Sequence, residues 1–438
     1  MGDTNGQSKT TEGEYTPHER EVVGSVIEIW KKNPATETLG NAKLHQLVKR
    51  EHPTWSLSEK RLKNLLKQHG LQTHTPIVQY VSETVSAPTP GLELPPGVRL
   101  EMTKSRGKAL YAARAFSEGD LIWEEEPLVL VAPLDVIPLM RKTLACAHCA
   151  RPFQQRSKAG GVPMGGSDCK TCPARWCGPK CRKADCIHAA LWHQAGHTRV
   201  KEDVWQRFEQ FCLENEWNAA YGYGIVLLNM LKDPSKGKLR KKIDAMAQVR
   251  QDVRQKAVDS AQPQSSNPFG GGGGGLLQEQ YEALWKEGYE LLRDAVGPSY
   301  TLTYDEWMLG LGMFNINNLD GNLFLTQSHL NHSCAPNVDV KIVGRTAGIK
   351  VYAKRAIKQG EELLTTYVNP NDPLAKRRYD LRVNWGFQCN CTRCKEEDKE
   401  ATQAAEAQLS GLTLATPMAD RTRRKSVRFD EKPQLQSS

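Results

Sequence analysis

The sequence contains no long apolar run. No stretch of about 18 apolar residues occurs among its 438 residues, which excludes a membrane-spanning helix. Residues 1–16 are polar and lack the apolar core of a secretory signal, so we expect this segment to be disordered and the chain to work in the cytoplasm or nucleus. Because these compartments are reducing, the twelve cysteines are expected to bind metal rather than to form disulfides.

One segment of the chain contains few acidic residues, and another contains few basic residues. Residues 140–201 contain two acidic residues against twelve Lys and Arg, whereas residues 276–330 contain two basic residues against eight acidic ones. A basic segment can contact a polyanion, and an acidic segment can attract a cationic substrate. The alternative is that both are solvated faces that only keep the protein soluble.

Residues 17–75 are expected to form a small helical unit. Apolar residues recur at helical spacing in three places, and Gly70 follows the third. The third helix carries four basic residues: Lys60, Arg61, Lys63 and Lys67. Three short helices with a sharp turn at residues 52–55 resemble a helix-turn-helix, whose basic face would contact nucleic acid. The alternative is a protein-docking bundle with a solvated basic face.

The middle of the chain is rich in cysteine and histidine. Residues 146–197 contain four pairs with the spacing of zinc ligands: Cys146 and Cys149, Cys169 and Cys172, Cys177 and Cys181, and His193 and His197. Zinc takes four such ligands in a tetrahedron, and two ligands a few residues apart can close on one ion. Eight ligands therefore predict two zinc ions.

Three motifs toward the C-terminus carry the most information. Asn-His-Ser-Cys-Ala-Pro-Asn spans residues 331–337, Gly-Glu-Glu-Leu-Leu-Thr-Thr-Tyr spans residues 360–367, and Gly-Phe-x-Cys-x-Cys-x-x-Cys spans residues 386–394. Far upstream, Arg-Gly-Lys-Ala-Leu-Tyr spans residues 106–111. In this order and spacing, the motifs closely resemble the SET domain of protein-lysine methyltransferases. With the cysteine-rich module between the two SET halves, the chain resembles the SET-and-MYND subfamily, and most of all its fungal branch, which includes histone-lysine methyltransferases.

This resemblance implies an α+β fold. It would consist of a β-rich SET core whose C-terminal segment forms a pseudoknot, an inserted MYND zinc finger, a helical insertion and a cysteine-rich post-SET flap. The expected boundaries are 1–16 (disordered), 17–75 (N-terminal helical unit), 98–145 (first SET part), 146–197 (MYND finger), 198–300 (helical insertion), 301–368 (second SET part), 369–395 (post-SET) and 396–438 (disordered basic tail). Within the insertion, the glycine-rich residues 261–275 are expected to form a flexible linker.

The resemblance also implies roles for the site residues. Tyr367 would be the catalytic tyrosine that orients the target amine and the incoming methyl group of S-adenosyl-L-methionine. The amino-acid end of this cofactor would be bound by residues of the first loop and of the Asn-His motif: Arg106, Gly107, Lys108, Asn331 and His332. Its adenine would lie against Trp385 or Phe387.

Three zinc ions are implied by the same resemblance. One would be held by Cys334, Cys389, Cys391 and Cys394. The MYND order assigns a second ion to Cys146, Cys149, Cys177 and Cys181, and a third to Cys169, Cys172, His193 and His197. The family generally has cysteine at the last position, so Cys186 or His188 are alternatives to His197.

Together these features predict a monomeric S-adenosyl-L-methionine-dependent protein-lysine N-methyltransferase that acts on a core histone tail. Its basic finger and N-terminal helices would contact nucleic acid. One alternative is a lysine methyltransferase of a ribosomal or other non-histone protein. Another is a MYND-based protein-binding adaptor with a vestigial SET core. Ala109 would favour the adaptor, because it stands where the family's first loop usually has a second glycine and its methyl group would crowd the cofactor.

Overall fold

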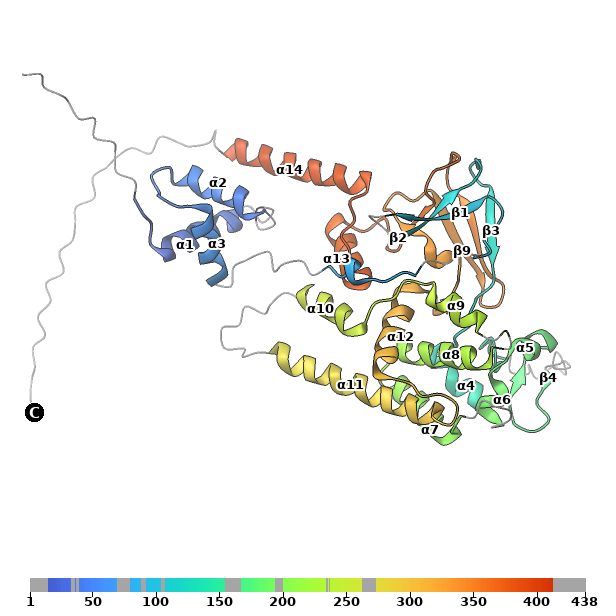
Figure 1. Ribbon diagram of the computed structural model, residues 1–438. Coiled ribbons are helices and arrows are strands. Elements are labelled where there is room, and N and C mark those ends of the chain that lie inside the picture. Colours follow the sequence, from blue (N-terminus) through green and yellow to red (C-terminus); the bar gives the residue numbers. More distant parts are fainter. Residues whose placement is uncertain are drawn as a thin grey trace, which may run out of the picture. The chain divides into compact units, whose positions relative to one another are not determined.

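The computed structural model describes most of the chain: residues 15–32, 36, 39–68, 79–87, 92–103, 107–153, 167–193, 200–233, 235, 237–261 and 273–412. The chain divides into two compact units, each of which is described by itself: Met1–Leu62 with Glu396–Ser438, and Lys63–Lys395 (Figure 1). None of the described helices is long and apolar enough to cross a membrane.

The smaller unit contains α1 (Glu19–Lys32), α2 (Asn41–Glu51) and the start of α3 (Glu59–Gln68), which are three helices where the apolar spacing predicts them. Each helix buries one apolar face, and these faces supply Val22, Val26, Ile29, Leu44, Val48 and Leu62. The third helix begins where the Ser58 hydroxyl accepts the backbone N–H of Arg61 (3.2 Å). A serine at this position satisfies one of the free N–H groups of the first turn.

Two details of this unit differ from expectation. Tyr15 belongs to the segment predicted to be disordered, yet its backbone N–H donates to the carbonyl of Thr54 (2.8 Å). Residues 1–14 lie outside the described part of the chain. Arg61 was expected to face nucleic acid, but its guanidinium donates to the carbonyl of Pro17 (2.7 Å). The charge of Arg61 is therefore engaged within the unit.

The C-terminal segment also differs from expectation. Disorder was predicted from residue 396, whereas α14 runs over Thr392–Leu412. This stretch is rich in Ala, Glu, Gln and Lys, which are strong helix formers even without a packed core. The basic cluster beyond residue 412 lies outside the described residues.

The larger unit has a β-rich part made of short antiparallel sheets and one parallel pair (Figure 1). Its strands are β1 (Val98–Thr103), β2 (Gly107–Ala112), β3 (Leu121–Glu125), β6 (Asn318–Leu319), β7 (Asn322–Leu323), β8 (Asn331–His332), β9 (Val338–Gly344), β10 (Gly348–Ala353) and β11 (Leu364–Thr365). β1 pairs with β2, β10 lies between β3 and β9, and β8 pairs with β11 in parallel. The apolar residues of these strands bury one another in a core that includes Leu110, Ile122, Trp123, Ile349 and Val351.

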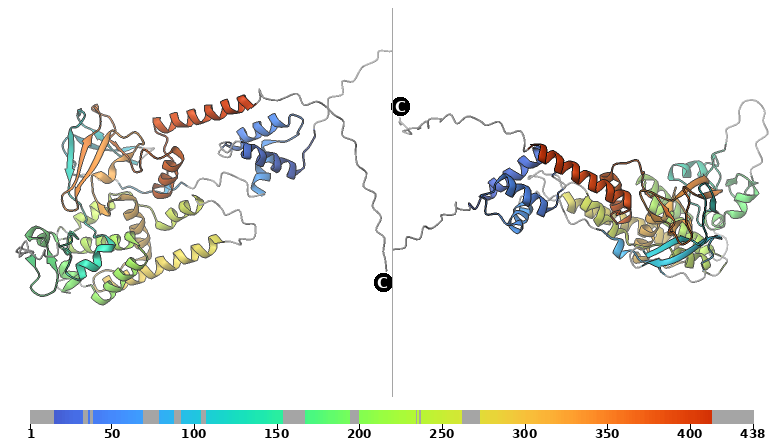
Figure 2. Two further views of the ribbon diagram at one scale, coloured as in Figure 1. Left: turned by 180° about the vertical axis from the view of Figure 1, so that it is seen from behind. Right: turned by 90° about the horizontal axis from the view of Figure 1, so that it is seen from above.

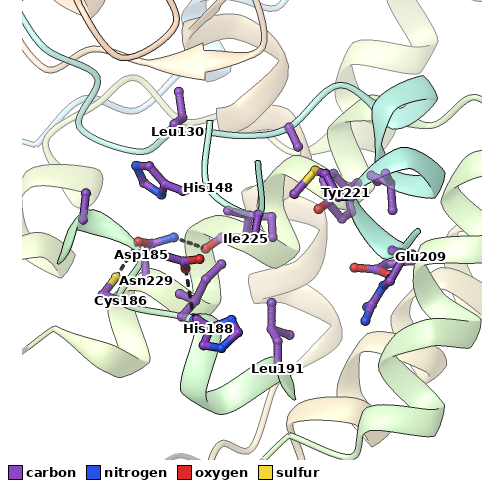
Figure 3. A pocket seen from close by; sticks show the side chains of 17 residues that line it. Leu130, His148, Asp185, Cys186, His188, Leu191, Glu209, Tyr221, Ile225 and Asn229 are labelled. Carbon is purple, nitrogen blue, oxygen red and sulfur yellow. Dashed lines mark hydrogen bonds and ion pairs between the residues drawn. The ribbon is translucent and has the colours of Figure 1, made fainter. Parts of the chain in front are cut away.

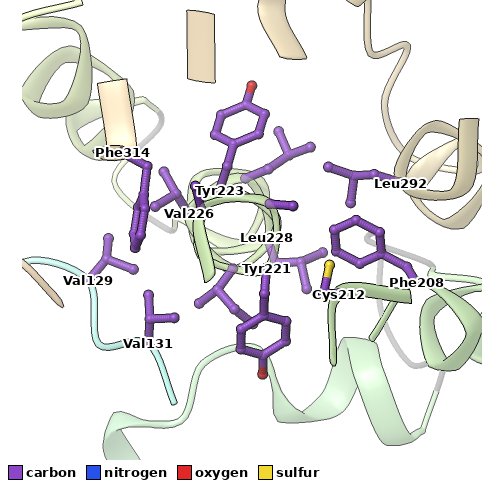
Figure 4. Packing of buried hydrophobic residues seen from close by; sticks show 14 of the residues in the cluster. Val129, Val131, Phe208, Cys212, Tyr221, Tyr223, Val226, Leu228, Leu292 and Phe314 are labelled. Atoms are coloured by element: carbon purple, nitrogen blue, oxygen red, sulfur yellow. The ribbon is translucent and has the colours of Figure 1, made fainter. Parts of the chain in front are cut away.

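A helical body accompanies the strands within the same unit. Its helices are α7 (Glu202–Glu214), α8 (Asn218–Lys232), α9 (Lys238–Asp244), α10 (Gln251–Ala261), α11 (Gly273–Val296), α12 (Tyr304–Asn317) and α13 (Leu374–Trp385). α8 is apolar on nearly every side, and neighbouring segments surround it (Figure 4). Gly222 on α8 allows this close packing, because a Cβ atom there would lie 2.2 Å from the ring of Phe314.

Small elements connect these parts or build the cysteine-rich module. They are η2 (Val81–Glu83), η3 (Leu134–Val136), α4 (Ile137–Arg141), β4 (Ser167–Asp168), β5 (Arg175–Trp176), α5 (Pro179–Ala184), α6 (His188–Trp192) and η4 (Gln327–His329). Figure 2 shows the chain from two further directions. The predicted linker 261–275 lies mostly outside the described residues, but its last glycines are helical because α11 begins at Gly273.

Candidate functional site

Three of the sequence motifs converge where β2, β8 and β11 lie side by side. β8 and β11 pair in parallel, so that Asn331 lies opposite Leu364 and His332 opposite Thr365. On the other side, the backbone N–H of Leu363 donates to the carbonyl of Leu110 in β2 (2.8 Å). The segment that leads to Tyr367 is therefore held between the first loop and the Asn-His motif.

Tyr367 is fixed by two hydrogen bonds. Its hydroxyl donates to the carbonyl of Leu330 (2.5 Å), and its backbone N–H donates to Nδ1 of His332 (3.0 Å). Burial raises the pKa of Tyr367, and the carboxylate of Glu362 raises it further. The phenol is therefore neutral at physiological pH. Because its proton is committed to a carbonyl, the phenol oxygen can accept a hydrogen bond from another group.

The side chain of Asn331 bridges two motifs. Its amide nitrogen donates to the carbonyl of Lys108 (3.1 Å) and to Oε1 of Glu362 (3.0 Å). The amide is thus oriented by the first loop on one side and by the Gly-Glu-Glu motif on the other. This places the two segments expected to bind the amino-acid end of the cofactor directly beside each other.

The first loop is described from Gly107 onward, and Arg106 lies outside the described residues. Gly107 has a φ of +69°, which favours glycine, and a Cβ atom there would meet no neighbour within 4 Å. The ammonium of Lys108 donates to the carbonyl of Ala245 (2.7 Å), and burial lowers the pKa of this lysine to about 8. Ala109 lies within β2 opposite Glu101, in extended geometry that any L-residue adopts. The local backbone therefore does not require a glycine at Ala109.

Aromatic rings surround Tyr367. The ring centroid of Trp385 lies 5.0 Å and that of Phe387 6.4 Å from the Tyr367 ring. Tyr367 and Trp385 also line a pocket of about 360 Å³. Asp320, Asp339 and Lys354 belong to the lining of this pocket, so it combines an aromatic wall with two carboxylates and one ammonium group. Because the two carboxylates outnumber the ammonium group, the pocket can attract a basic segment of another chain.

A cluster of four cysteines lies next to this site. The sulfur atoms of Cys334, Cys389, Cys391 and Cys394 lie within 4.8 Å of one another. Sγ of Cys334 lies 3.4 Å from that of Cys394 and 4.0 Å from that of Cys389. Nε2 of His332 lies 3.4 Å from Sγ of Cys334, and Nδ1 of the same ring accepts the backbone N–H of Tyr367. His332 therefore connects this cluster to Tyr367.

The cysteine-rich module holds two further clusters. The first, Cys146, Cys149, Cys177 and Cys181, agrees with the expected set. The second consists of Cys169, Cys172, His188 and His193. His188 thus stands where His197 was expected, and His197 lies outside the described residues. The other alternative, Cys186, points elsewhere and donates to Oδ1 of Asn229 (3.2 Å).

Asp185 explains why His188 faces the second cluster. Its carboxylate accepts the backbone N–H of His188 (3.1 Å) at the start of α6 and the indole N–H of Trp176 (2.9 Å). Figure 3 shows Asp185, Cys186 and His188 around a pocket between the cysteine-rich module and the helical body. Nε2 of His188 lies 3.6 Å from Sγ of Cys172 and 2.9 Å from Nε2 of His193.

The geometry of all three clusters fits a zinc ion. Four sulfurs at about 2.3 Å from a tetrahedral zinc lie about 3.8 Å apart. The sulfur pairs at 3.4 and 4.0 Å in the cluster of Cys334, and the pair Cys149–Cys177 at 3.4 Å, bracket this value. The donor sets, four thiols or two thiols with two imidazoles, are those of structural zinc sites. Each cluster can therefore hold one metal ion.

Comparison with known proteins agrees with this geometry. The pattern of the SET domain matches residues 107–368. A protein of Yarrowia lipolytica named histone-lysine N-methyltransferase SET5 is 46% identical, over 96% of this chain and 93% of its own length. A protein of the same name from Candida albicans is 44% identical, over 95% of this chain and 93% of its own length. Another from Eremothecium gossypii is 33% identical, over 97% of this chain and 87% of its own length.

The chain belongs to the SET domain family. It groups with the proteins named histone-lysine N-methyltransferase SET5 and is a protein-lysine methyltransferase.

This SET domain also uses residues that the motifs alone did not single out. Tyr80 is fully buried, and its backbone N–H donates to the carbonyl of Gly386, next to Phe387 (3.0 Å). A Cβ atom at Gly386 would lie 2.4 Å from the Tyr80 ring, so a residue larger than glycine at this position would clash with the ring. Arg254 completes the contact by donating to the Tyr80 hydroxyl (3.3 Å). A lone tyrosine before a proline-rich stretch gives no sequence signal for this role.

Proposed function

We propose that this SET domain methylates lysine residues of a core histone tail, with S-adenosyl-L-methionine as methyl donor and zinc in all three clusters. Support for the reaction comes chiefly from the position of Tyr367, which is held by Leu330 and by His332 of the Asn-His motif. The relatives named histone-lysine N-methyltransferase support the histone substrate. A histone substrate would place the enzyme in the nucleus, while its presence in the cytoplasm stays a prediction from the sequence.

Methyl transfer requires a neutral lysine amine, because only the neutral form has a lone pair. A free lysine has a pKa of about 10.4, so the site has to favour loss of the proton. The phenol oxygen of Tyr367 would accept an N–H of the amine and point its lone pair at the methyl group. The aromatic walls of Trp385 and Phe387 would exclude water and so disfavour the charged amine.

S-adenosyl-L-methionine would supply an electrophilic methyl group on a sulfonium. The residues that fit its amino-acid end are Gly107, whose open backbone leaves space, and Lys108 and Asn331, which are hydrogen-bonded to each other. Lys108 would offer its ammonium to the carboxylate. Phe387 or Trp385 would pack against the adenine.

We assign the two clusters of residues 146–193 to a MYND-type finger and the cluster of Cys334 to a post-SET flap. The interleaved pairing of the first finger cluster supports the MYND assignment. His188 would replace His197 as the last ligand. The finger keeps its basic residues after zinc binding, and contact between this surface and nucleic acid is part of the proposal.

The test is transfer of a labelled methyl group from S-adenosyl-L-methionine to nucleosomes, free histones and ribosomal proteins. We expect label on a histone, and a loss of at least about a hundredfold in the Tyr367→Phe variant, because an unpositioned amine rarely reaches the methyl group. Tyr379→Phe is the matched control, since Tyr379 is exposed on α13. Label on ribosomal proteins alone would contradict the histone assignment, and absence of label with full zinc content would favour the adaptor.

A further inference from the structure

One arginine is buried against the cysteine cluster of the flap. Arg377 on α13 is only 1% exposed. Its Nε lies 3.3 Å from Sγ of Cys334 and its Nη2 lies 3.8 Å from Sγ of Cys394. Its Nη1 donates to the carbonyl of Asp372 (2.6 Å). Two of the three guanidinium nitrogens thus face sulfur atoms of one cluster.

The charge of Arg377 needs compensation because this side chain is buried. A guanidinium stays protonated in proteins, and burying a charge is costly unless an opposite charge or strong acceptors compensate it. A neutral thiol is a weak acceptor, whereas a thiolate is both a strong acceptor and an anion. The two N–H···S contacts of Arg377 therefore suit a cluster with negative charge, as four thiolates around one zinc ion would have.

The charge balance of the flap cluster leads to the same residue. Four thiolates and one divalent zinc carry a net charge of −2, and the cluster is largely buried, since Cys334, Cys389 and Cys394 are all buried. Arg377 brings this to −1 from one side. His332 adds a second hydrogen-bond donor to Cys334, at 3.4 Å.

The contacts continue to the catalytic tyrosine. His332 points Nε2 at Sγ of Cys334 and accepts the backbone N–H of Tyr367 at Nδ1. A chain of direct contacts therefore runs from Arg377 through Cys334 and His332 to Tyr367. Any shift of the Cys334 sulfur would move the imidazole that holds the tyrosine backbone.

We propose that Arg377 is a positioning residue that compensates the charge of the flap zinc site and, through Cys334 and His332, fixes Tyr367. This inference rests on the proposed zinc occupancy and lysine methylation. Arg377 touches neither substrate nor cofactor. It sets the affinity of the flap for zinc and the geometry of the hydroxyl that orients the amine.

The test compares Arg377→Gln and Arg377→Lys with Arg378→Gln in the full chain. Arg378 is the matched control, because it lies next in α13 and donates to the carbonyl of Cys389 (3.4 Å). Zinc per chain, zinc release to a chelator and the sulfur-to-metal absorption of the cobalt-substituted protein are measured together with methyl transfer. A Cys391→Ser variant identifies which phase of zinc release belongs to the flap.

We expect Arg377→Gln to weaken zinc binding in the flap by about ten- to a hundredfold, as loss of groups that support metal ligands does elsewhere. The two finger sites should be unaffected. The cobalt absorption should shift, and kcat should fall more than KM rises. Arg377→Lys keeps the charge but not the two-point contact, so we expect an intermediate effect. It also keeps the inference testable if Arg377→Gln does not fold.

Suppose that the wild type holds three zinc ions and that both Arg377 variants keep its zinc affinity in the flap and its cobalt absorption. This result would overturn the inference and leave the proposed function intact. An equal effect of Arg378→Gln would also overturn it. A wild-type protein without zinc in the flap would instead refute the zinc assignment on which the inference rests.

Discussion

The flap cluster and the two-histidine cluster of the finger are chemically similar but are built into the fold differently. Cys334, Cys389 and Cys394 of the flap are buried, and both Arg377 and His332 contact the sulfur of Cys334. In the finger cluster, Cys169 and Cys172 are half-exposed, and the residue that supports it, Asp185, orients a ligand rather than the active site. We infer from this difference that a metal ion bound in the flap would organise catalysis, whereas one bound in the finger would hold a separate surface in shape.

The largest expected effect separates the two clusters. Cys391→Ser in the flap should lower kcat by about a hundredfold, because Tyr367 loses its support through Cys334 and His332. The matched change in the finger, Cys172→Ser, should lower kcat by less than about fivefold. Methyl transfer to nucleosomes measures both, with thermal unfolding as a check that the variants are folded. Equal losses in the two variants would refute the distinction.

The next prediction concerns Tyr80, which packs on Gly386. Tyr80→Ala removes a fully buried ring that packs on Gly386, and we expect a loss of about 3 kcal/mol in the free energy of unfolding, as for other buried aromatic residues. Cofactor affinity should fall as well, because Phe387 follows Gly386. Denaturant unfolding and calorimetry with S-adenosyl-L-methionine measure the two effects. Tyr80→Phe keeps the ring and should change stability by less than half as much.

A smaller effect is expected at the pocket beside Tyr367. Asp320→Asn and Asp339→Asn each remove one carboxylate from its lining and should raise KM for a basic histone peptide by about two- to fivefold, since exposed ion pairs contribute roughly 0.2–1 kcal/mol. The effect should shrink at high salt, whereas kcat should not change. A change in kcat without a change in KM would place these carboxylates in the chemistry instead of in substrate attraction.

The last prediction is a dependence of stability on pH at Lys108. Burial lowers the pKa of Lys108 to about 8, while the unfolded chain has the ordinary value near 10.5. Between these values the unfolded state binds more protons, so the stability of the wild type relative to Lys108→Met should rise as the pH rises from about 8 to 10.5. Urea unfolding at several pH values measures this. Lys350→Met is the control and should show no such rise, because the ion pair of Lys350 with Glu124 (2.6 Å) raises the pKa of this lysine instead of lowering it.

The structure brings residues of the motifs together, whereas the residues that support them belong to no motif. Asn331, His332 and Tyr367 come together as their order implied, because short strands force these segments to pair. The fourth ligand of the second finger cluster could not be chosen from spacing alone. His188 occupies it because Asp185, hydrogen-bonded to Trp176, sets where α6 begins. That is a tertiary contact without a sequence signature.

Arg377 and Tyr80 were missed for a similar reason. Their roles depend on burial against sulfur atoms and against a glycine, and both partners are distant in the sequence or lie on another element. The end of the chain was misjudged in the opposite way. The polar composition after residue 395 predicted disorder, but the helix propensity of the same residues extends α14 to Leu412.

The most direct test of the central claim removes zinc stepwise with a chelator and follows zinc content and methyl transfer on the same sample. We expect the finger zinc to leave first, with most of the activity retained. Activity should disappear when the flap site loses its ion, and comparison with Cys391→Ser identifies that site. Full activity after the flap has lost its zinc would contradict the claim that this cluster positions Tyr367.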